Sequence, residues 1–459
     1  MATVKSATEW LDNQKTTRFH YLVIILSFFV LAFDGYDSQI LSYVMPQLIK
    51  EWNLTPVEAG SIASYGFIGL IIGTAFFGML SDAIGRKKAL MFAIADFTIF
   101  SGAAYFAPTF ETFSFLRLLA GMGMGGAMPI TIALVSEYAP AHVRGKAVTA
   151  MFSGFTSGWV LAALVAMGVI PVLGWRAVLL IGVLPILYIP ILIKYLPESI
   201  RFLASKGRHQ EAILELRKVE KASGSQPIAW GPEHFEIVQT QSKTGFKDLF
   251  TPQFAFMTII ISITYFFNLL TVYGLSSWLP TLLVKKGFSL VKSYSFGMVQ
   301  AIMASLGALF LGSMIDAFGR KKTMVTAYIL GAISIVFFGY AESTTAMMIA
   351  AGFTGFFIMG SQTAQHVITG ETFPTKIRST GVGFVYSVGR IGSFVAPLMG
   401  GAMMMANFSF SSFFLAFAIA PLVCAVCVYF YKVSDEGVGL EEITDKLTGH
   451  ELSPKSPGA

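Results

Sequence analysis

Apolar residues follow one another in long runs along this chain, and short polar segments separate the runs. Roughly 20 consecutive apolar residues suffice to cross the hydrocarbon core of a bilayer as a helix. Twelve runs approach or exceed that length, near residues 20–46, 58–80, 89–107, 114–138, 147–170, 176–195, 252–284, 293–315, 323–341, 345–370, 381–404 and 408–432. The pattern therefore predicts an all-α membrane protein with 12 transmembrane helices. The first run has no small-residue cleavage site, which indicates a retained helix and not a signal peptide.

The sequence also repeats itself at a constant offset of 234 residues. The segment Gly78–Lys88 reads GMLSDAIGRKK, and Gly312–Lys322 reads GSMIDAFGRKK. The same offset relates single residues of the two halves: Glu137 to Glu371, Pro140 to Pro374 and Arg144 to Arg378. The repeat predicts two homologous six-helix bundles. Parallel halves of this kind are typical of secondary transporters, whose substrate site lies between the repeats near the midplane.

The polar segments divide the predicted architecture into four parts. We expect an N-terminal six-helix half (1–196), a cytoplasmic linker (197–250), a C-terminal six-helix half (251–432) and a disordered cytoplasmic tail (433–459). The linker contains a predicted surface helix around His209–Lys221. The other loops are too short to hold a catalytic domain, so we expect a transporter and not an enzyme.

The basic residues of the chain are distributed unevenly between the two predicted sides of the membrane. The net charge is +6, and the basic residues of the short loops lie on one predicted side of the membrane, together with both tails and the linker: Arg86, Lys87, Lys88, Arg144, Lys146, Arg320, Lys321, Lys322, Lys376 and Arg378. This bias follows the positive-inside rule and places both termini in the cytoplasm. Membrane lipids, and not a nucleic acid, are the expected surroundings. The cluster Lys285, Lys286 and Lys292 lies on the opposite side, as a local exception.

Two short motifs suggest cofactor or metal chemistry but stand in the wrong setting. Cys424 and Cys427 form C-x-x-C inside the last predicted helix, without further ligands, so we interpret them as packing or lipid-facing residues. Gly121-x-Gly123-x-x-Gly126 matches a dinucleotide motif, but it lies in an apolar helix instead of a strand–helix turn. Its glycines more plausibly permit close helix contact. No cofactor or metal is expected.

Acidic residues inside the first predicted helix are the leading candidates for function. A charge in a membrane helix costs at least about 2.5–3.5 kcal/mol and so needs a reason. Asp34 and Asp37, in Asp34-Gly35-Tyr36-Asp37, lie on one helical face, where mutual repulsion raises the proton affinity of one carboxylate. We predict a proton-coupling site. The alternative is that one acid caps a kinked helix while the other holds an arginine. Asn268 occupies the position equivalent to Asp34, which confines protonation to the N-terminal half.

Two intramembrane arginines are candidates for binding an anion. Arg390 lies about nine residues, or 13 Å, into the eleventh predicted helix, flanked by glycines. Its planar guanidinium suits a carboxylate, so we predict substrate binding; an ion pair with Asp34 or Asp37 is the alternative. Arg117, in the fourth helix, is either a second anion site or the fixed partner of a first-helix aspartate.

Other polar and aromatic residues in the predicted helices leave their roles open. Gln362 and His366 share a face of the tenth helix, and His366 is either a proton relay or a hydrogen-bonded packing residue. Asp96 has no assigned role. Several aromatic residues are candidates for lining a cavity as well as for packing: Tyr36, Tyr65, Tyr265, Phe266, Phe267 and Tyr273.

The repeated Gly-x-x-x-Asp-x-x-Gly-Arg-Lys-Lys loops resemble the signature of the major facilitator superfamily, and the resemblance covers nearly the whole chain. The resemblance implies a cytoplasmic charge network that gates transport without binding substrate. Its members here are Asp82, Arg86, Glu137, Arg144, Asp316, Arg320, Glu371 and Arg378.

Asp34-Gly35-Tyr36-Asp37 matches the D-G-x-D pattern of the aromatic acid:proton symporters, and Arg117 and Arg390 match intramembrane arginines of that family. The resemblance implies a bacterial inner-membrane carrier that imports an aromatic or related organic carboxylate with a proton, by alternating access, as a functional monomer. The segment Pro197–Leu203 is similar to the sugar and organic-ion branches. A sugar or polyol symporter, or a transporter-like sensor of aromatic acids, is therefore the alternative.

Overall fold

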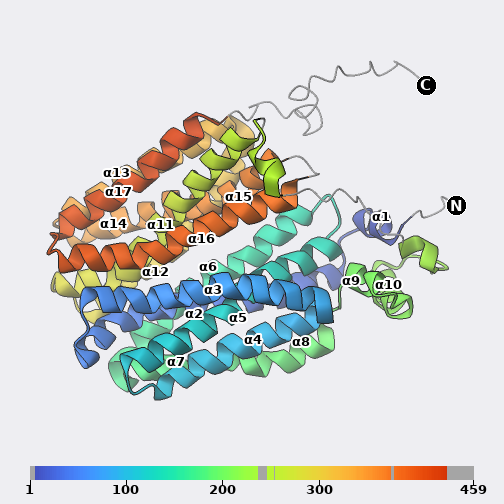
Figure 1. Cartoon of the computed structure of the whole chain (residues 1–459), viewed down its shortest axis with the longest axis horizontal. Coiled ribbons are helices and arrows are strands. Elements are labelled where there is room, and N and C mark those ends of the chain that lie inside the picture. Colours follow the sequence, from blue (N-terminus) through green and yellow to red (C-terminus); the bar gives the residue numbers. More distant parts are fainter. Residues whose placement is uncertain (1–5, 236–245, 253, 374–376, 432–459) are drawn as a thin grey trace. The chain divides into compact units, whose positions relative to one another are not determined.

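The computed structural model describes residues 6–235, 246–252, 254–373 and 377–431 of the 459-residue chain. Within these ranges the regular elements are helices, and 12 helical spans are long and apolar enough to cross a membrane (Figure 1). The predicted all-α membrane fold is confirmed. The spans are formed by α2 (Arg18–Trp52), α3 (Pro56–Ile84), α4 (Arg86–Ala103), α5 (Phe110–Tyr138), α6 (Arg144–Leu173), α7 with α8 (Trp175–Ile181 and Ile189–Tyr195), α11 (Ala255–Lys285), α12 (Leu290–Phe318), α13 (Arg320–Tyr340), α14 with α15 (Thr344–Thr354 and Gly360–Thr372), α16 (Arg378–Met405) and α17 (Phe410–Tyr429).

The sequence repeat returns as a repeat of helix boundaries. Four helices of each half begin at residues that differ by 234 positions: α3 and α12 at Pro56 and Leu290, α4 and α13 at Arg86 and Arg320, α5 and α14 at Phe110 and Thr344, and α6 and α16 at Arg144 and Arg378. Pro46 in α2 and Pro280 in α11 obey the same offset. The two halves therefore share one scaffold.

A glycine makes the turn inside each repeated loop. Gly85 separates α3 from α4 at φ 104°, and Gly319 separates α12 from α13 at φ 88°. Side chains other than that of glycine rarely tolerate this backbone conformation. The glycine of each Gly-Arg-Lys-Lys segment thus lets two membrane helices follow each other across a single residue.

Packing divides the chain into two compact units. Unit 1 comprises Met1–Thr240, Ser276–Ile302 and Pro397–Phe408, and unit 2 comprises Gln241–Leu275, Met303–Ala396 and Ser409–Ala459. In unit 1, α2 packs along α6, while α3 and α4 pack on α5. In unit 2, α13 packs along α17 and on α14 (Figure 1). The four parts predicted from the sequence are contiguous along the chain, whereas each unit combines separate segments. The predicted boundaries stay a prediction.

Unit 1 also contains end segments of three helices that continue into unit 2. Two hydrogen bonds hold these segments within unit 1. The Trp278 indole Nε1 donates to the Pro397 carbonyl at 2.9 Å, and the Tyr294 hydroxyl donates to the Tyr43 carbonyl at 2.8 Å. Both acceptors are backbone carbonyls of helices that contain a proline, Pro46 in α2 and Pro397 in α16.

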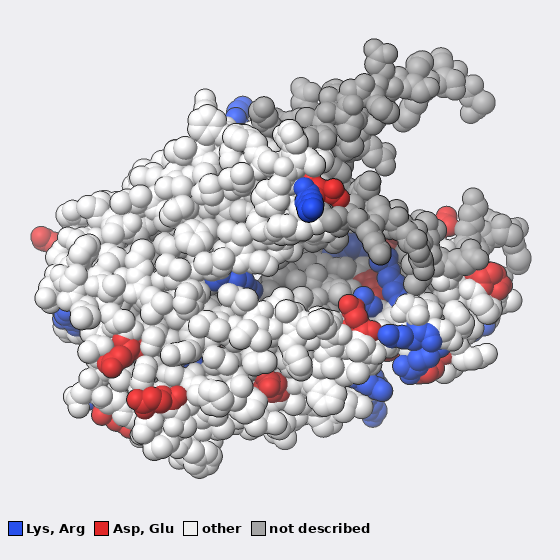
Figure 2. Space-filling model, in the orientation of Figure 1, with Lys and Arg blue, Asp and Glu red and all other residues white. Residues whose placement is uncertain are grey.

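The polar segments carry three further helices, α1 (Ala7–Asp12), α9 (Ile200–Ser205) and α10 (His209–Ser223), which gather at one end of unit 1. The helix α10 contains the surface helix that the sequence predicts around His209–Lys221. Lysine and arginine side chains collect over this end (Figure 2), where Arg201, Lys206, Lys218 and Lys221 are exposed. The surface of the spans instead exposes large apolar side chains such as Phe92 and Ile333, as expected of contact with lipid tails.

Glycines set the distance between α2 and α6. A Cβ atom added at Gly35 would lie 2.1 Å from the Phe155 carbonyl oxygen, and one added at Gly158 would lie 2.1 Å from that of Ala32. Small residues allow membrane helices to pack backbone against backbone in this way. Gly35, between the two aspartates, therefore accommodates a neighbouring helix.

We expect Gly158→Ala to destabilise the protein by about 1–3 kcal/mol, because the added methyl group must push the two helix backbones apart. The matched control is Gly168→Ala, on the same helix, where an added Cβ has no neighbour within 4 Å. Thermal unfolding of the detergent-purified variants measures both. A lowered midpoint for Gly168→Ala, or an unchanged one for Gly158→Ala, would contradict this account of the packing.

Candidate functional site

The first-helix acids lie deep inside unit 1. Asp34 and Asp37 are 3% and 2% exposed. The Arg117 guanidinium, from α5, reaches Asp37 with its Nη1 atom 3.1 Å from the carboxylate Oδ2, and its Nη2 donates to the Asp37 carbonyl at 3.2 Å. Nη1 also donates to the Ser101 hydroxyl of α4 at 3.2 Å. The structure thus contains the ion pair that the sequence left as one of two possibilities for Arg117.

Tyr36 lies between the two acids and is also buried. Its hydroxyl donates to the Val178 carbonyl of α7 at 2.7 Å. This bond ties α2 to α7 across a long stretch of sequence. The hydroxyl is therefore engaged by the scaffold of unit 1, which favours the packing interpretation of this ring over a direct substrate contact.

Asp96 of α4 has a structural neighbour that the sequence did not suggest. Its carboxylate lies against Gly123 of α5, where an added Cβ would come within 2.8 Å of Oδ2. That oxygen is buried and lacks a hydrogen-bond partner among the described residues.

The other glycines of this α5 motif also lie against a neighbouring helix. A Cβ atom added at Gly121 would lie 2.1 Å from the Gly66 carbonyl oxygen of α3. The glycine motif of α5 is thus a helix-packing surface, as interpreted from its setting.

Unit 2 gathers a second set of polar side chains around His366 of α15. The hydroxyls of Tyr265 (α11) and Tyr386 (α16) both hydrogen-bond to the His366 Nδ1 atom, the latter at 2.6 Å. The two tyrosine rings lie 4.9 Å apart. We call these three residues the phenol–imidazole cluster. Tyr386 was not a candidate from the sequence, although its position four residues before Arg390 places both side chains on one face of α16.

Arg390 belongs to the same region of unit 2. It is half-buried and lies one helical turn after Tyr386 on α16. Gly389 beside it makes room for Tyr265, because a Cβ there would lie 2.4 Å from the tyrosine ring. The predicted anion-binding residue and His366 are therefore neighbours.

An irregular turn in the tenth span positions its polar face. The segment Gly355–Met359 forms a π-helical turn between α14 and α15, a feature that occurs frequently at functional sites. The Ile358 carbonyl in this turn accepts hydrogen bonds from the Ser361 hydroxyl at 2.8 Å and the Asn268 side-chain amide at 3.4 Å. Asn268 thus supports the turn, while Gln362 lies half-buried one helical turn before His366.

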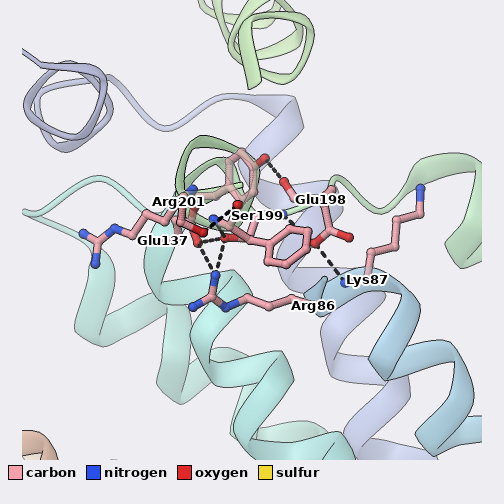
Figure 3. A network of polar contacts seen from close by, with 9 residues as sticks. Arg86, Lys87, Glu137, Glu198, Ser199 and Arg201 are labelled. Carbon is pink, nitrogen blue, oxygen red and sulfur yellow. Dashed lines mark hydrogen bonds and ion pairs between the residues drawn. The ribbon is translucent and has the colours of Figure 1, made fainter. Parts of the chain in front are cut away.

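Two of the predicted gating residues of the N-terminal half, Arg86 and Glu137, lie in a network of polar contacts at the end of unit 1 (Figure 3). Arg86, at the start of α4, lies 3.7 Å from the Glu137 carboxylate of α5. Ser199 bridges the two: Arg86 Nη1 donates to its hydroxyl at 2.5 Å, and the hydroxyl donates to Glu137 at 2.6 Å. Glu198 accepts from the Lys87 backbone N–H at 3.0 Å. Glu198 and Ser199 belong to the segment Pro197–Leu203, which is similar to the sugar and organic-ion branches. This segment is therefore part of the network.

The remaining predicted gating residues have other neighbours or lie outside the description. Arg144 pairs with Asp12 of α1. Asp82 is exposed and forms no ion pair with a described residue. The side chains of Asp316 and Glu371 lie outside the described part, so the network of the second half stays a prediction. There, the Arg378 Nε atom donates to the Phe373 carbonyl at 3.1 Å, and Arg320 begins α13.

Comparison with known proteins relates the whole chain to membrane carriers. Residues 21–447 match the family model described as sugar (and other) transporter. The chain is 34% identical over 433 residues to the niacin transporter NiaP of Acinetobacter baylyi, covering 94% of this chain and 98% of that protein. It is 32% identical to the benzoate transport protein of the same organism, covering 92% of each. It is 31% identical to the gallate transporter of Pseudomonas putida, covering 92% and 93%.

The fold is similar to that of a solved carrier. The inward open conformation of the xylose transporter XylE from E. coli superposes with a TM-score of 0.74, covering 93% of this chain and 99% of that one, at 18% sequence identity. At this identity the likeness shows the fold alone.

We expect Arg117→Met to destabilise the protein by about 3–5 kcal/mol, because it leaves the Asp37 carboxylate buried without its cation. Arg176→Met is the matched control. It breaks an arginine–carboxylate pair, with Glu51, in which both side chains are at least 34% exposed, and such pairs contribute about 1 kcal/mol or less. Thermal unfolding in detergent measures both variants. Equal losses of thermal stability in the two variants would show that the buried Asp37–Arg117 pair contributes no more than the exposed Glu51–Arg176 pair.

We expect Ser199→Ala to loosen α9 and α10 from the bundle, because the hydroxyl links Arg86 to Glu137 and also caps α9 by accepting from the Phe202 N–H. Loss of an N-cap alone costs about 0.5–2 kcal/mol. Faster amide hydrogen exchange in α9 and α10 is the readout. Ser205→Ala, on the same helix, removes only a hydroxyl that bonds the Phe202 carbonyl and should leave the exchange unchanged. Identical exchange in the two variants would exclude the bridging role of Ser199.

Proposed function

The chain belongs to the sugar (and other) transporter family of the major facilitator superfamily, and from this premise we propose that it imports an aromatic or related organic carboxylate together with a proton. The relatives named for niacin, benzoate and gallate support this substrate class. Twelve spans and bacterial relatives support a multi-pass protein of the inner membrane. We further propose cytoplasmic termini and a functional monomer.

Arg390 is the residue we propose to hold the substrate carboxylate. The observation that carries this assignment is that the two intramembrane arginines have different surroundings. Arg117 lies against the Asp37 carboxylate and donates to the Asp37 backbone and to Ser101. Arg390 instead lies half-buried beside tyrosine and histidine side chains. A planar guanidinium with aromatic neighbours suits an aromatic carboxylate. Gln362, and His366 with its tyrosines, are the proposed further substrate contacts.

The proton site is proposed to be the acidic pair of α2, with Asp34 carrying the exchangeable proton. Asp37 is held by Arg117, whose Nη1 atom lies 3.1 Å from the carboxylate Oδ2. Asp34 lies one helical turn away and is equally buried. A proton on Asp34 removes a negative charge from the interior of unit 1. The charge network at Arg86, Glu137 and Ser199 is proposed to govern gating without contacting substrate.

A sugar or polyol carrier is the alternative that the family description and the xylose-transporter fold bring forward. A neutral sugar has no carboxylate for the planar guanidinium of Arg390 to bind, whereas an organic acid has one. The carboxylate assignment is therefore preferred. A sensor of aromatic acids would bind the same ligands without accumulating them.

We expect purified wild-type protein in proteoliposomes to acidify the lumen when benzoate, nicotinate or a hydroxybenzoate is added outside, in a saturable manner and not with xylose. Arg390→Ala and Asp34→Asn should abolish both acidification and uptake of labelled acid. Arg208→Ala, which breaks an exposed ion pair with Glu211 on α10, is the control and should transport normally. Protein-free liposomes correct for passive entry of the neutral acid.

Each result has a separate meaning. Near-normal uptake by Arg390→Ala or Asp34→Asn would remove that residue from the mechanism. Competition by sugars, without competition by aromatic acids, would replace the proposed substrate class. Saturable binding without uptake would favour the sensor.

A further inference from the structure

A pocket lies at the N-terminus of α13 in unit 2, between α11, α15 and the end of α17. It encloses about 320 Å³ of space, open solvent included. Part of its wall is apolar and comes from Met324, Ile368 and Val428. Residues with hydrogen-bond donors line it as well, among them Lys321, Gln365 and Tyr431. The pocket therefore combines several donors with an apolar surface.

Two of these donors are buried and lack an acceptor among the described residues. Gln365 is 2% exposed, and its Oε1 atom accepts from the Tyr328 hydroxyl at 2.8 Å. The Nε2 atom of the same amide faces away from Tyr328 and has no partner. Tyr431 is 6% exposed, and its hydroxyl has none either. Because a buried donor without an acceptor costs free energy, two such donors beside one pocket indicate a ligand that supplies acceptor oxygens.

The start of α13 adds backbone donors to the same pocket. The first N–H groups of a helix have no acceptor within the helix, and the helix dipole favours negative charge there. The N-cap residue of α13 is Gly319, which has no side chain to cap these groups. Lys321 brings a positive charge to the first turn. The backbone, the lysine and the two buried donors thus all favour an anion.

The sequence repeat indicates which anion fits this position. In unit 1 the equivalent helix, α4, has a carboxylate at its N-terminus, because Glu198 accepts from the Lys87 N–H at 3.0 Å. A Cβ atom added at Gly85, the preceding N-cap, would lie 2.4 Å from the other oxygen of Glu198. Lys87 is the counterpart of Lys321, but the counterpart of Glu198 is Lys432. The second half therefore repeats the helix start without a carboxylate at the matching position.

Arg320 also lines the pocket. The repeat makes it the counterpart of Arg86, which lies 3.7 Å from the Glu137 carboxylate in unit 1. By the same relation, the expected partner of Arg320 is Glu371, whose side chain lies outside the described part of the chain. The charge of Arg320 is thus assigned to the predicted network, and the other donors of the pocket remain for an anion.

We propose that the pocket at the start of α13 is a carboxylate-binding site, in which the carboxylate accepts from Tyr431, Gln365 and the first N–H groups of α13. Lys321 compensates its charge, and the apolar wall contacts the carbon atoms next to it. The bound group joins α13 to α15 and to the end of α17, as Glu198 joins α4 to the segment after α8. Arg390 is not among the described residues that line this pocket, so the site is distinct from the proposed substrate site.

Two sources can supply a carboxylate at this place. One is a small organic acid in solution. The other is the chain itself, because Asp435 and Glu436 follow Tyr431 within five residues of the sequence. The chemistry of the site is the same for both, and measurements on the full-length protein distinguish them.

The test measures the thermal unfolding midpoint of the detergent-purified protein while sodium acetate replaces sodium chloride at constant ionic strength and pH. Acetate has a carboxylate and no aromatic ring. Tyr431→Phe removes one hydroxyl and keeps the ring, and it should raise the apparent Kd for acetate about tenfold. Tyr429→Phe, at a 60% exposed position of α17, should leave the Kd unchanged. Gln365→Glu is a second site variant, since one oxygen still accepts from Tyr328 while the other repels acetate and should abolish the response.

The two sources give different patterns. With a free acid as the ligand, acetate raises the wild-type midpoint by about 2–4 °C, and neutralising the nearby acids by Asp435→Asn with Glu436→Gln changes nothing. With a carboxylate from the chain, the wild type does not respond to acetate, and the double variant unfolds at a lower temperature. Acetate then restores the midpoint of the double variant, and adding Tyr431→Phe weakens this rescue. Either pattern supports the carboxylate site.

Three results would overturn it. The first is the lack of an acetate response in both the wild type and the double variant. The second is an equal response in Tyr431→Phe and Tyr429→Phe, which would place acetate elsewhere. The third is a Tyr431-dependent response to inorganic phosphate that exceeds the response to acetate. None of these results bears on uptake through Arg390, so the proposed function stands or fails separately.

Discussion

Charge in an apolar interior is the constraint on which the rest of this structure depends. A charged side chain within a membrane span is costly, so it persists only where a partner or a function compensates for it. The buried pair of Asp37 and Arg117 meets the constraint inside unit 1, with further hydrogen bonds to Ser101 and to the α2 backbone. Arg390 lies half-buried on α16, one helical turn after Tyr386. Under the proposed function Arg117 is the structural arginine and Arg390 is the one that binds the substrate anion.

The same constraint explains why the scaffold repeats while its chemistry does not. Helix starts and loop glycines recur at an offset of 234 residues. The charged positions within the spans do not: the counterpart of Arg117 is Ala351, that of Arg390 is Thr156, and that of Asp34 is Asn268. Folding two halves requires the same caps, turns and close helix contacts in each. A substrate with one charged end requires its cationic partner only once, so the two halves could diverge there.

The sequence predicted the spans, the repeat and the buried acids because each depends on local pattern or on the energetics of single residues. It allowed the Asp37–Arg117 pair without deciding it, since the pair depends on how α2 and α5 rotate against each other. It missed the Ser199 bridge, the Asp12–Arg144 pair and the tyrosines on His366. These contacts join segments far apart in the chain, and serine or tyrosine at such positions differs little from ordinary packing residues.

Under the proposed function, coupling follows from the arrangement of charges within each unit. Unit 1 holds the two acids Asp34 and Asp37 beside Arg117 in its buried α2 site, so a proton on Asp34 lowers the negative charge of that site. Unit 2 holds Arg390 on α16, so a bound carboxylate lowers the positive charge there. A helix bundle that closes over either charge must desolvate it, at a cost of several kcal/mol. Proton and substrate each remove one such cost, and closure is least expensive when both are bound. Symport then requires no direct contact between proton and acid, because the two share the same electrostatic barrier.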